Sequence, residues 1–248
     1  MVFITVLLTV SGFAQKTADI GIWGGTSTYW GDIEKAFPLQ TFNFNFGAFF
    51  RYNFNARVAL RTQFLTGSFA ANGVVENGDW EFSKNAQDLS AMIEINYLKY
   101  ILGEKKTPFT PYIMGGIGVM YFPYRFDTND LTLLGTINPY HPLLLAGAAV
   151  EESVIALAIP FGFGIKFSLG ERLGIGAEYQ IRKLFNDKLD NMDDPLSFSK
   201  ANDEGVIETI KYTDFWHKND WPGYLGVFIT YKIFMETKAC PAYDRKYW

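Results

Sequence analysis

The segment RLGIGAEYQIR, Arg172–Arg182, alternates strictly between apolar side chains and side chains that are polar or absent. Successive side chains on a β-strand point to opposite faces, so this segment predicts a strand with one apolar face. Its other face carries glycine, a carboxylate, an amide and a guanidinium. A half-buried strand of a soluble domain shows the same alternation, so the length and recurrence of the pattern decide between the two environments.

Eight segments of this kind follow one another along the chain, and each is ten or more residues long. A tilted strand needs roughly 9–11 residues to cross a bilayer, whereas strands of soluble proteins cluster near about 5–6 residues. The lengths therefore favour strands that span a membrane. The predicted strands are Ala18–Trp30, Phe42–Asn53, Val58–Ser68, Leu89–Leu102, Pro111–Tyr124, Ala156–Leu169, Leu173–Arg182 and Tyr224–Phe234.

The connections between these strands alternate in length. Outer-membrane barrels have short periplasmic turns and long extracellular loops. The sequence therefore predicts an all-β protein, an eight-stranded antiparallel transmembrane β-barrel with four long extracellular loops, short periplasmic turns and periplasmic termini. The short connections are Asn53–Arg57, Gly103–Thr110 and Gly170–Arg172, and the long ones are Gly31–Thr41, Phe69–Gln87, Arg125–Ile155 and Lys183–Gly223.

The apolar segment Leu143–Ile159 is the strongest candidate for a membrane helix, but Glu151 and Glu152 lie at its centre. Each such charge costs about 2.5–3.5 kcal/mol at the centre of a membrane helix. We interpret the segment as a loop that lies against the barrel mouth and leads into the sixth strand, with room for a short helix.

The chain begins with an apolar run, Val2–Val10, followed by the small-residue segment Ser11–Ala14. This pattern is typical of a secretory signal peptide cut after Ala14, and the run is too short to span a membrane. The alternative is a hydrophobic first strand. The predicted organisation is a signal peptide at residues 1–14, an outer-membrane barrel at 15–235 and a periplasmic C-terminal tail at 236–248.

The polar strand faces predict a charged lumen. An eight-stranded barrel is only wide enough for side chains to fill, and buried charges have to be paired. We therefore expect an ion-paired plug, with a substrate or ion path as the alternative. The predicted lumen network consists of Arg51, Arg61, Glu94, Lys166, Glu178 and Arg182.

Aromatic residues near the strand ends are typical of the interfacial girdles of membrane barrels. A soluble lipocalin-like barrel has the same strand number, but it would pack its apolar faces inward. Charged residues in the middle of strands favour the membrane barrel, because they suit a lumen filled by ion pairs. The predicted girdle residues are Tyr29, Trp30, Tyr52, Tyr100, Tyr121, Phe122 and Tyr124.

The sequence offers little for catalysis or for metal binding. Cys240 is the single cysteine, and both histidines, His141 and His217, fall in predicted loops without a serine-containing motif nearby. The acidic segment Asp187–Asp194 lacks the spaced ligands and the glycine of a calcium loop. A net charge of −4 without a basic block argues against a nucleic-acid partner. We expect no enzymatic activity, no cofactor and no metal.

Several glycine and aromatic motifs recur along the predicted strands: Trp23-Gly24-Gly25, Tyr29-Trp30-Gly31-Asp32, Phe46–Tyr52, Pro108–Tyr112 and Gly115–Gly118. Together they resemble the PorG family, small outer-membrane barrels of the Bacteroidetes type IX secretion system. The resemblance spans the mature chain. It implies a non-enzymatic component of protein secretion that associates with a periplasmic ring made of a lipoprotein and a partner protein. It transfers no functional residue.

The periplasmic turns and the tail are the expected docking surface for such a partner, because lipid covers the barrel wall. Aromatic residues and arginine, which the tail contains, are enriched at interface hot spots. The alternative is a stand-alone small barrel, which commonly ends at an aromatic residue such as Phe234, acting as an adhesin, a small-solute pore or a lipid-modifying enzyme. The candidate partner-binding residues are Lys105, Lys106, Glu171, Tyr243, Arg245 and Trp248.

Overall fold

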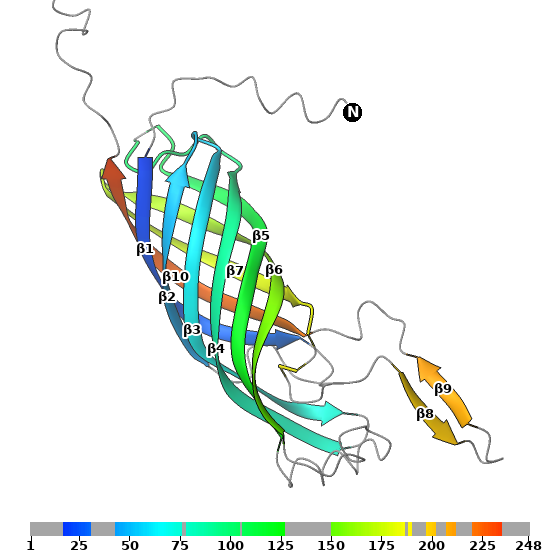
Figure 1. Cartoon of the computed structure of the whole chain (residues 1–248). Helices are drawn as coiled ribbons and strands as arrows, with labels where there is room; N and C mark the ends of the chain where they lie inside the picture. The colour runs from blue at the N-terminus through cyan, green and yellow to red at the C-terminus, as the bar shows by residue number, and fades with distance from the viewer. Residues whose placement is uncertain are drawn as a thin grey trace, which may run out of the picture.

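Eight strands close into one antiparallel barrel in the computed structural model (Figure 1). The structure describes residues 17–30, 43–75, 78–104, 106–126, 150–186, 188–189, 197–201, 207–211 and 220–234. In barrel order the strands are β1 (Thr17–Trp30), β10 (Trp221–Phe234), β7 (Leu173–Leu184), β6 (Val150–Leu169), β5 (Phe109–Phe126), β4 (Gly78–Asn96), β3 (Val58–Val75) and β2 (Phe44–Asn53). The predicted eight-stranded antiparallel barrel is therefore confirmed.

Pairing of the first barrel strand with the last closes the sheet. The register of β1 and β10 runs from Thr17 opposite Phe234 to Trp30 opposite Trp221. Two further strands, β8 (Ser197–Ala201) and β9 (Ile207–Lys211), pair with each other in a separate two-stranded sheet. Among the described residues, no helix is long and apolar enough to cross a membrane.

The predicted long loop Phe69–Gln87 is wrong, because most of it is strand. β3 and β4 stay paired up to Val75 opposite Gly78. The period-2 alternation persists in this hairpin, but its polarity is reversed, so a search for an outward apolar row misses it. The outward positions of β4 here are Glu81, Ser83, Asn85 and Gln87, and the buried inward positions are Phe82, Lys84 and Ala86.

Within the segment Leu143–Ile159, residues Val150–Ile155 were predicted as loop but are also strand. β6 begins at Val150, and Glu151 lies opposite Arg125 of β5. The side chains of Glu151 and Glu152 are exposed. At the other end of the barrel, β4 ends at Asn96 and not at Leu102. The signal peptide and the tail at residues 236–248 lie outside the described residues and stay predictions.

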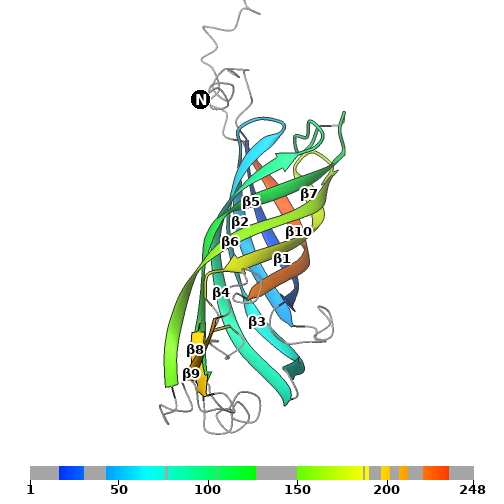
Figure 2. The ribbon, with the colours of Figure 1, turned by 90° about the vertical axis from the view of Figure 1, so that its right-hand side faces the viewer.

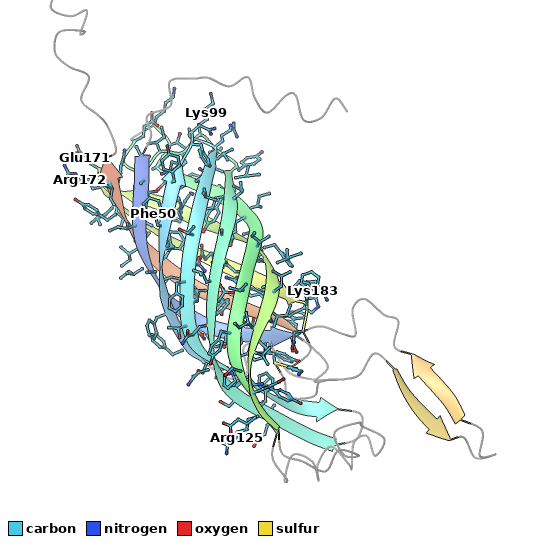
Figure 3. The ribbon with its side chains drawn as sticks, in the orientation of Figure 1. Phe50, Lys99, Arg125, Glu171, Arg172 and Lys183 are labelled. Atoms are coloured by element: carbon cyan, nitrogen blue, oxygen red, sulfur yellow. The ribbon has the colours of Figure 1, made fainter. Side chains whose placement is uncertain are left out.

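The outer surface of the barrel carries a broad apolar band. Figure 3 shows Phe50 on this surface, and its side chain is 40% exposed. Residues next to these positions in each strand point inward. A closed sheet with an apolar exterior and a polar interior is the arrangement of a transmembrane barrel. Members of the band include Ile20, Ile22, Phe46, Phe50, Ile93, Ile113, Ile117, Leu157, Phe163, Val227 and Ile229.

The two hairpins β3–β4 and β5–β6 extend past this band, beyond the strands around them (Figures 1 and 2). We call the barrel end with the short connections the turn side and the opposite end the loop side. On the loop side the outward residues of β4 change from Leu89 to polar side chains at Gln87. The extended hairpins therefore have a polar exterior and an apolar interior, as a soluble sheet does.

Candidate functional site

Glu94 is the centre of a buried charge cluster inside the barrel. It projects from β4, and three cations from other strands converge on it. Lys166 Nζ of β6 donates to Glu94 Oε2 at 2.8 Å, and Arg51 Nε of β2 lies 2.8 Å from the same oxygen. Arg61 Nη1 of β3 lies 3.4 Å from Glu94 Oε1. The side chain of Glu94 is 0% exposed, so these cations must stabilise its charge in place of water.

Glu178 of β7 holds a second node of the cluster. Arg61 donates to both of its oxygens, at 2.7 and 2.8 Å, in a bidentate pair. The hydroxyl of Tyr112 and the side-chain amide of Gln180 also donate to this carboxylate. Arg61 thus connects Glu94 and Glu178 across the lumen.

Two carboxylates that the sequence analysis missed complete the charge balance. Asp19 Oδ2 of β1 lies 3.5 Å from Arg51 Nη1. Arg182 pairs with Asp88 at 3.1 Å and with neither predicted glutamate. Alternation along the first strand could have found Asp19, which faces inward, whereas Asp88 stands just before the predicted start of its strand. We call the cluster of Asp19, Arg51, Arg61, Glu94, Lys166 and Glu178 the turn-side interior.

The charges of the turn-side interior are balanced and almost fully removed from solvent. Arg51, Arg61 and Lys166 face the carboxylates of Asp19, Glu94 and Glu178, and none of these six residues is more than 2% exposed. Aromatic rings pack against the guanidinium groups, with Arg61 Cζ 3.8 Å from the centroid of Phe49 and Arg51 Cζ 5.7 Å from that of Phe228. Such contacts stabilise desolvated cations.

The interior changes character toward the loop side. A cluster of buried apolar and aromatic residues runs through the interior, and toward the loop side it extends beyond the ion pairs of the turn-side interior. Four residues assigned to the girdle, Tyr29, Tyr100, Phe122 and Tyr124, are buried, so their predicted girdle position is wrong. Trp30 and Tyr121 are exposed and Tyr52 is partly exposed, as a girdle requires. We call Tyr29, Phe69, Phe82, Phe122, Tyr124, Leu184 and Leu189 the loop-side interior.

Lys84 is a buried cation that packs against the loop-side interior. Its Nζ lies 5.4–5.9 Å from the ring centroids of Phe82, Phe122 and Tyr124. It donates to the backbone carbonyl of Lys188 at 2.9 Å. Lys84 therefore connects the β3–β4 hairpin to the β5–β6 hairpin and to the segment after β7.

The chain after β7 is attached to the mouth of the barrel by Asp220. The hydroxyl of Tyr29 donates to Asp220 Oδ1 at 2.6 Å, and the backbone N–H of Leu189 donates to Oδ2 at 2.9 Å. Leu189 itself is 0% exposed. These contacts hold residues 188–189 against the loop-side interior.

The connection from β4 to β5 lies across the turn side of the lumen. Tyr100 and Leu102 are buried. Lys232 Nζ of β10 donates to the Leu102 carbonyl at 2.9 Å, and the Gly103 N–H donates to Ser168 Oγ of β6 at 3.3 Å. Gly103 has φ +88°, and a Cβ there would stand 2.0 Å from the Glu171 carbonyl oxygen. Burial raises the pKa of Tyr100, so its hydroxyl stays protonated.

A family model described as a domain of unknown function, DUF6089, matches residues 1–242. The chain belongs to the DUF6089 family. No curated protein sequence matches it significantly.

Solved structures similar to this DUF6089 protein are small barrels with low sequence identity. Ail, the attachment invasion locus protein of Yersinia pestis, matches at 12% identity over 88% of this chain and 99% of Ail, with a TM-score of 0.45. The outer membrane protein OprG of Pseudomonas aeruginosa matches at 12% identity over 89% of this chain and 98% of OprG, with a TM-score of 0.46. Neisserial surface protein A matches at 8% identity over 87% and 97% of the two chains, also with a TM-score of 0.46. Similarity at this level says nothing about function.

The predicted partner-binding residues of the DUF6089 barrel fall partly within the structure. Lys106 and Glu171 are exposed on the turn side, and Figure 3 shows Glu171 beside Arg172 at this end of the barrel. Lys105, Tyr243, Arg245 and Trp248 lie outside the described residues, as do His141 and His217. Within the described part of the chain, no group of three or more His, Cys, Asp or Glu residues could hold a metal ion.

Proposed function

We propose that this DUF6089 barrel is a non-enzymatic outer-membrane subunit of the type IX protein secretion machinery. The observation that carries the proposal is the lumen filled by the ion pairs of Glu94 and Glu178. A barrel filled in this way has no room for a substrate path, so it acts through its surfaces. The motif resemblance to the PorG family supports the assignment to type IX secretion.

In this role the chain is exported by its signal peptide, residues 1–14, and inserted with both termini and the short turns in the periplasm. A barrel in lipid offers a periplasmic partner little polar surface except its turns and termini. The partner is a periplasmic ring that contains a lipoprotein. The exposure of Lys106 and Glu171 supports the turns as part of the docking surface, and Tyr243, Arg245 and Trp248 supply the aromatic and arginine side chains of a hot spot.

Truncation after Glu236 tests this role, because it leaves all eight barrel strands intact. We expect the variant to insert and to migrate on gels with the heat dependence of a folded barrel. Co-purification of the periplasmic ring should fall by about tenfold or more, the loss expected when interface hot spots are removed, and secretion of cargo should fall with it.

A matched control is the deletion of residues 197–211, the β8–β9 hairpin, from the opposite end of the barrel. This deletion should leave co-purification of the ring unchanged. Full retention of partners and secretion in the tail truncation would show that the tail is not the docking site.

The alternative function is that of a stand-alone barrel. The filled lumen argues against its solute-pore form.

A further inference from the structure

The outer wall of the barrel is hollowed by a groove of about 660 Å³ over β10, β1, β2 and β3, which reaches Leu89 of β4. The volume lies in the range of ligand sites, about 300–1,000 Å³. Two short side chains, Ala48 and Thr62, form its base, and longer apolar side chains stand around them. The walls are Ile20, Ile22, Phe50, Phe64, Ile229 and Tyr231.

The strand register makes this groove continuous from β10 through β1 to β2. Ile20 of β1 stands between Tyr231 of β10 and Phe50 of β2. In the next outward row, Ile22 stands between Ile229 and Ala48 in the same way. Ile20, Ile22 and Phe50 are 47%, 65% and 40% exposed. They belong to the apolar band, so the medium that meets the groove is the hydrocarbon of the membrane.

One end of the groove is polar and charged. Arg172, in the turn between β6 and β7, donates from Nη1 to the Tyr231 hydroxyl at 3.2 Å. Arg172 and its neighbour Glu171 are exposed at the turn-side rim, above the wall that carries Phe50 (Figure 3). The hydrogen bond to Tyr231 raises the pKa of Arg172, and the Glu171 carboxylate adds to this effect. A cation and an anion therefore lie together at the end of the groove that Tyr231 lines.

We propose that this groove binds one molecule of phosphatidylethanolamine from the turn-side leaflet. An acyl chain fills the hollow at Ala48, the lipid phosphate accepts hydrogen bonds from Arg172, and the primary ammonium donates to Glu171. Guanidinium presents a planar set of donors that suits phosphate, and an ammonium has three donors for a carboxylate.

Charge complementarity and hydrogen bonding together select this lipid over other occupants. An anionic phospholipid has no cationic group to pair with the Glu171 carboxylate, and phosphatidylcholine has no N–H to donate to it. An apolar segment of another protein would leave the Glu171–Arg172 pair unused. A ligand that carries a phosphate and an ammonium on an apolar chain complements both charges and the groove at the same time.

Native mass spectrometry of the full-length protein in mild detergent tests the proposal. Phosphatidylethanolamine, phosphatidylglycerol and phosphatidylcholine with the same acyl chains are added separately. One retained phosphatidylethanolamine is expected, with about three- to fivefold preference over the other two, the size of an exposed ion pair. Equal retention of the three lipids would overturn the headgroup assignment. A dimer that retains no lipid would overturn the lipid as the occupant and indicate that a second copy of the chain covers the groove.

Three substitutions separate the parts of the site. Glu171→Gln should remove the preference for phosphatidylethanolamine over phosphatidylglycerol, whereas Arg172→Gln should lower retention of both. Ala48→Phe should fill the hollow and abolish the retained lipid. Heat-dependent gel migration verifies that each variant is folded.

Two control substitutions stand outside the groove. Arg57→Gln removes another exposed turn-side arginine, which donates to the Tyr97 carbonyl. Ala177→Phe enlarges an exposed outward position on β7. Both controls should retain lipid as the unsubstituted protein does. Retention by folded Ala48→Phe at the unsubstituted level would overturn the groove as the binding site.

Discussion

The turn-side and loop-side interiors of this barrel are enclosed by the same sheet but are built by opposite rules. At the level of the apolar band, the wall is apolar outside and the interior holds Asp19, Glu94 and Glu178 against three cations. In the extended hairpins the outer face is polar and rings such as Phe82 and Phe122 fill the inside. The sheet keeps its alternation throughout, and the surrounding medium decides which face is apolar.

Removal of one charged side chain should lower the free energy of unfolding in both interiors, and the effect should be largest in the turn-side interior. Glu94→Gln removes the carboxylate that Arg51, Lys166 and Arg61 share. Buried cations then lack a counter-charge, which we expect to lower the free energy of unfolding by about 3–5 kcal/mol. Urea unfolding in lipid vesicles, followed by tryptophan fluorescence, measures the change.

The control for that substitution is Glu152→Gln on the loop side. Glu152 pairs with Lys188 at 2.5 Å, but its side chain is 42% exposed. Removal of an exposed pair should cost less than about 1 kcal/mol. Equal costs for the two substitutions would contradict the distinction between a buried network and a solvated pair.

A smaller effect is expected for the cation of the loop-side interior. Lys84→Met keeps an apolar side chain of similar length and removes the charge beside Phe82, Phe122 and Tyr124. The loss of the cation–π contacts and of the hydrogen bond to the Lys188 carbonyl should lower the free energy of unfolding by about 1–2 kcal/mol. A cost as large as that of Glu94→Gln, measured in the same unfolding assay, would mean that the loop-side interior also depends on charge pairing.

The sequence predicted the barrel because the lipid-facing rows are strictly apolar at the period of a strand. All six predicted lumen residues are buried inside the barrel. Alternation predicted this, because residues such as Arg61 and Glu178 lie on the other face of the strand from the apolar residues next to them in sequence. Which charges pair could not be predicted, because pairing depends on the shear and closure of the barrel. Arg182 accordingly meets Asp88 of β4, 94 positions away in the chain.

The loop-side interior was harder to predict for a physical reason. Outside the membrane the apolar row turns inward, so Phe122 and Tyr124 resemble girdle residues in sequence although they are buried. The same inversion concealed the strand between Phe69 and Gln87. At Gln87 on β4, the apolar side chains change from odd-numbered to even-numbered positions. This change is the signal that could have revealed both the buried aromatic residues and the additional strand.

Electrical conductance of the purified full-length protein in a planar bilayer tests the central claim, that ion-paired side chains fill the lumen. Arg51, Arg61 and Lys166, balanced by their carboxylates, should leave no path for ions, so we expect no stable conductance steps. Reproducible ion-selective channels, whose selectivity changes in Glu94→Gln, would contradict the account and make the barrel a pore.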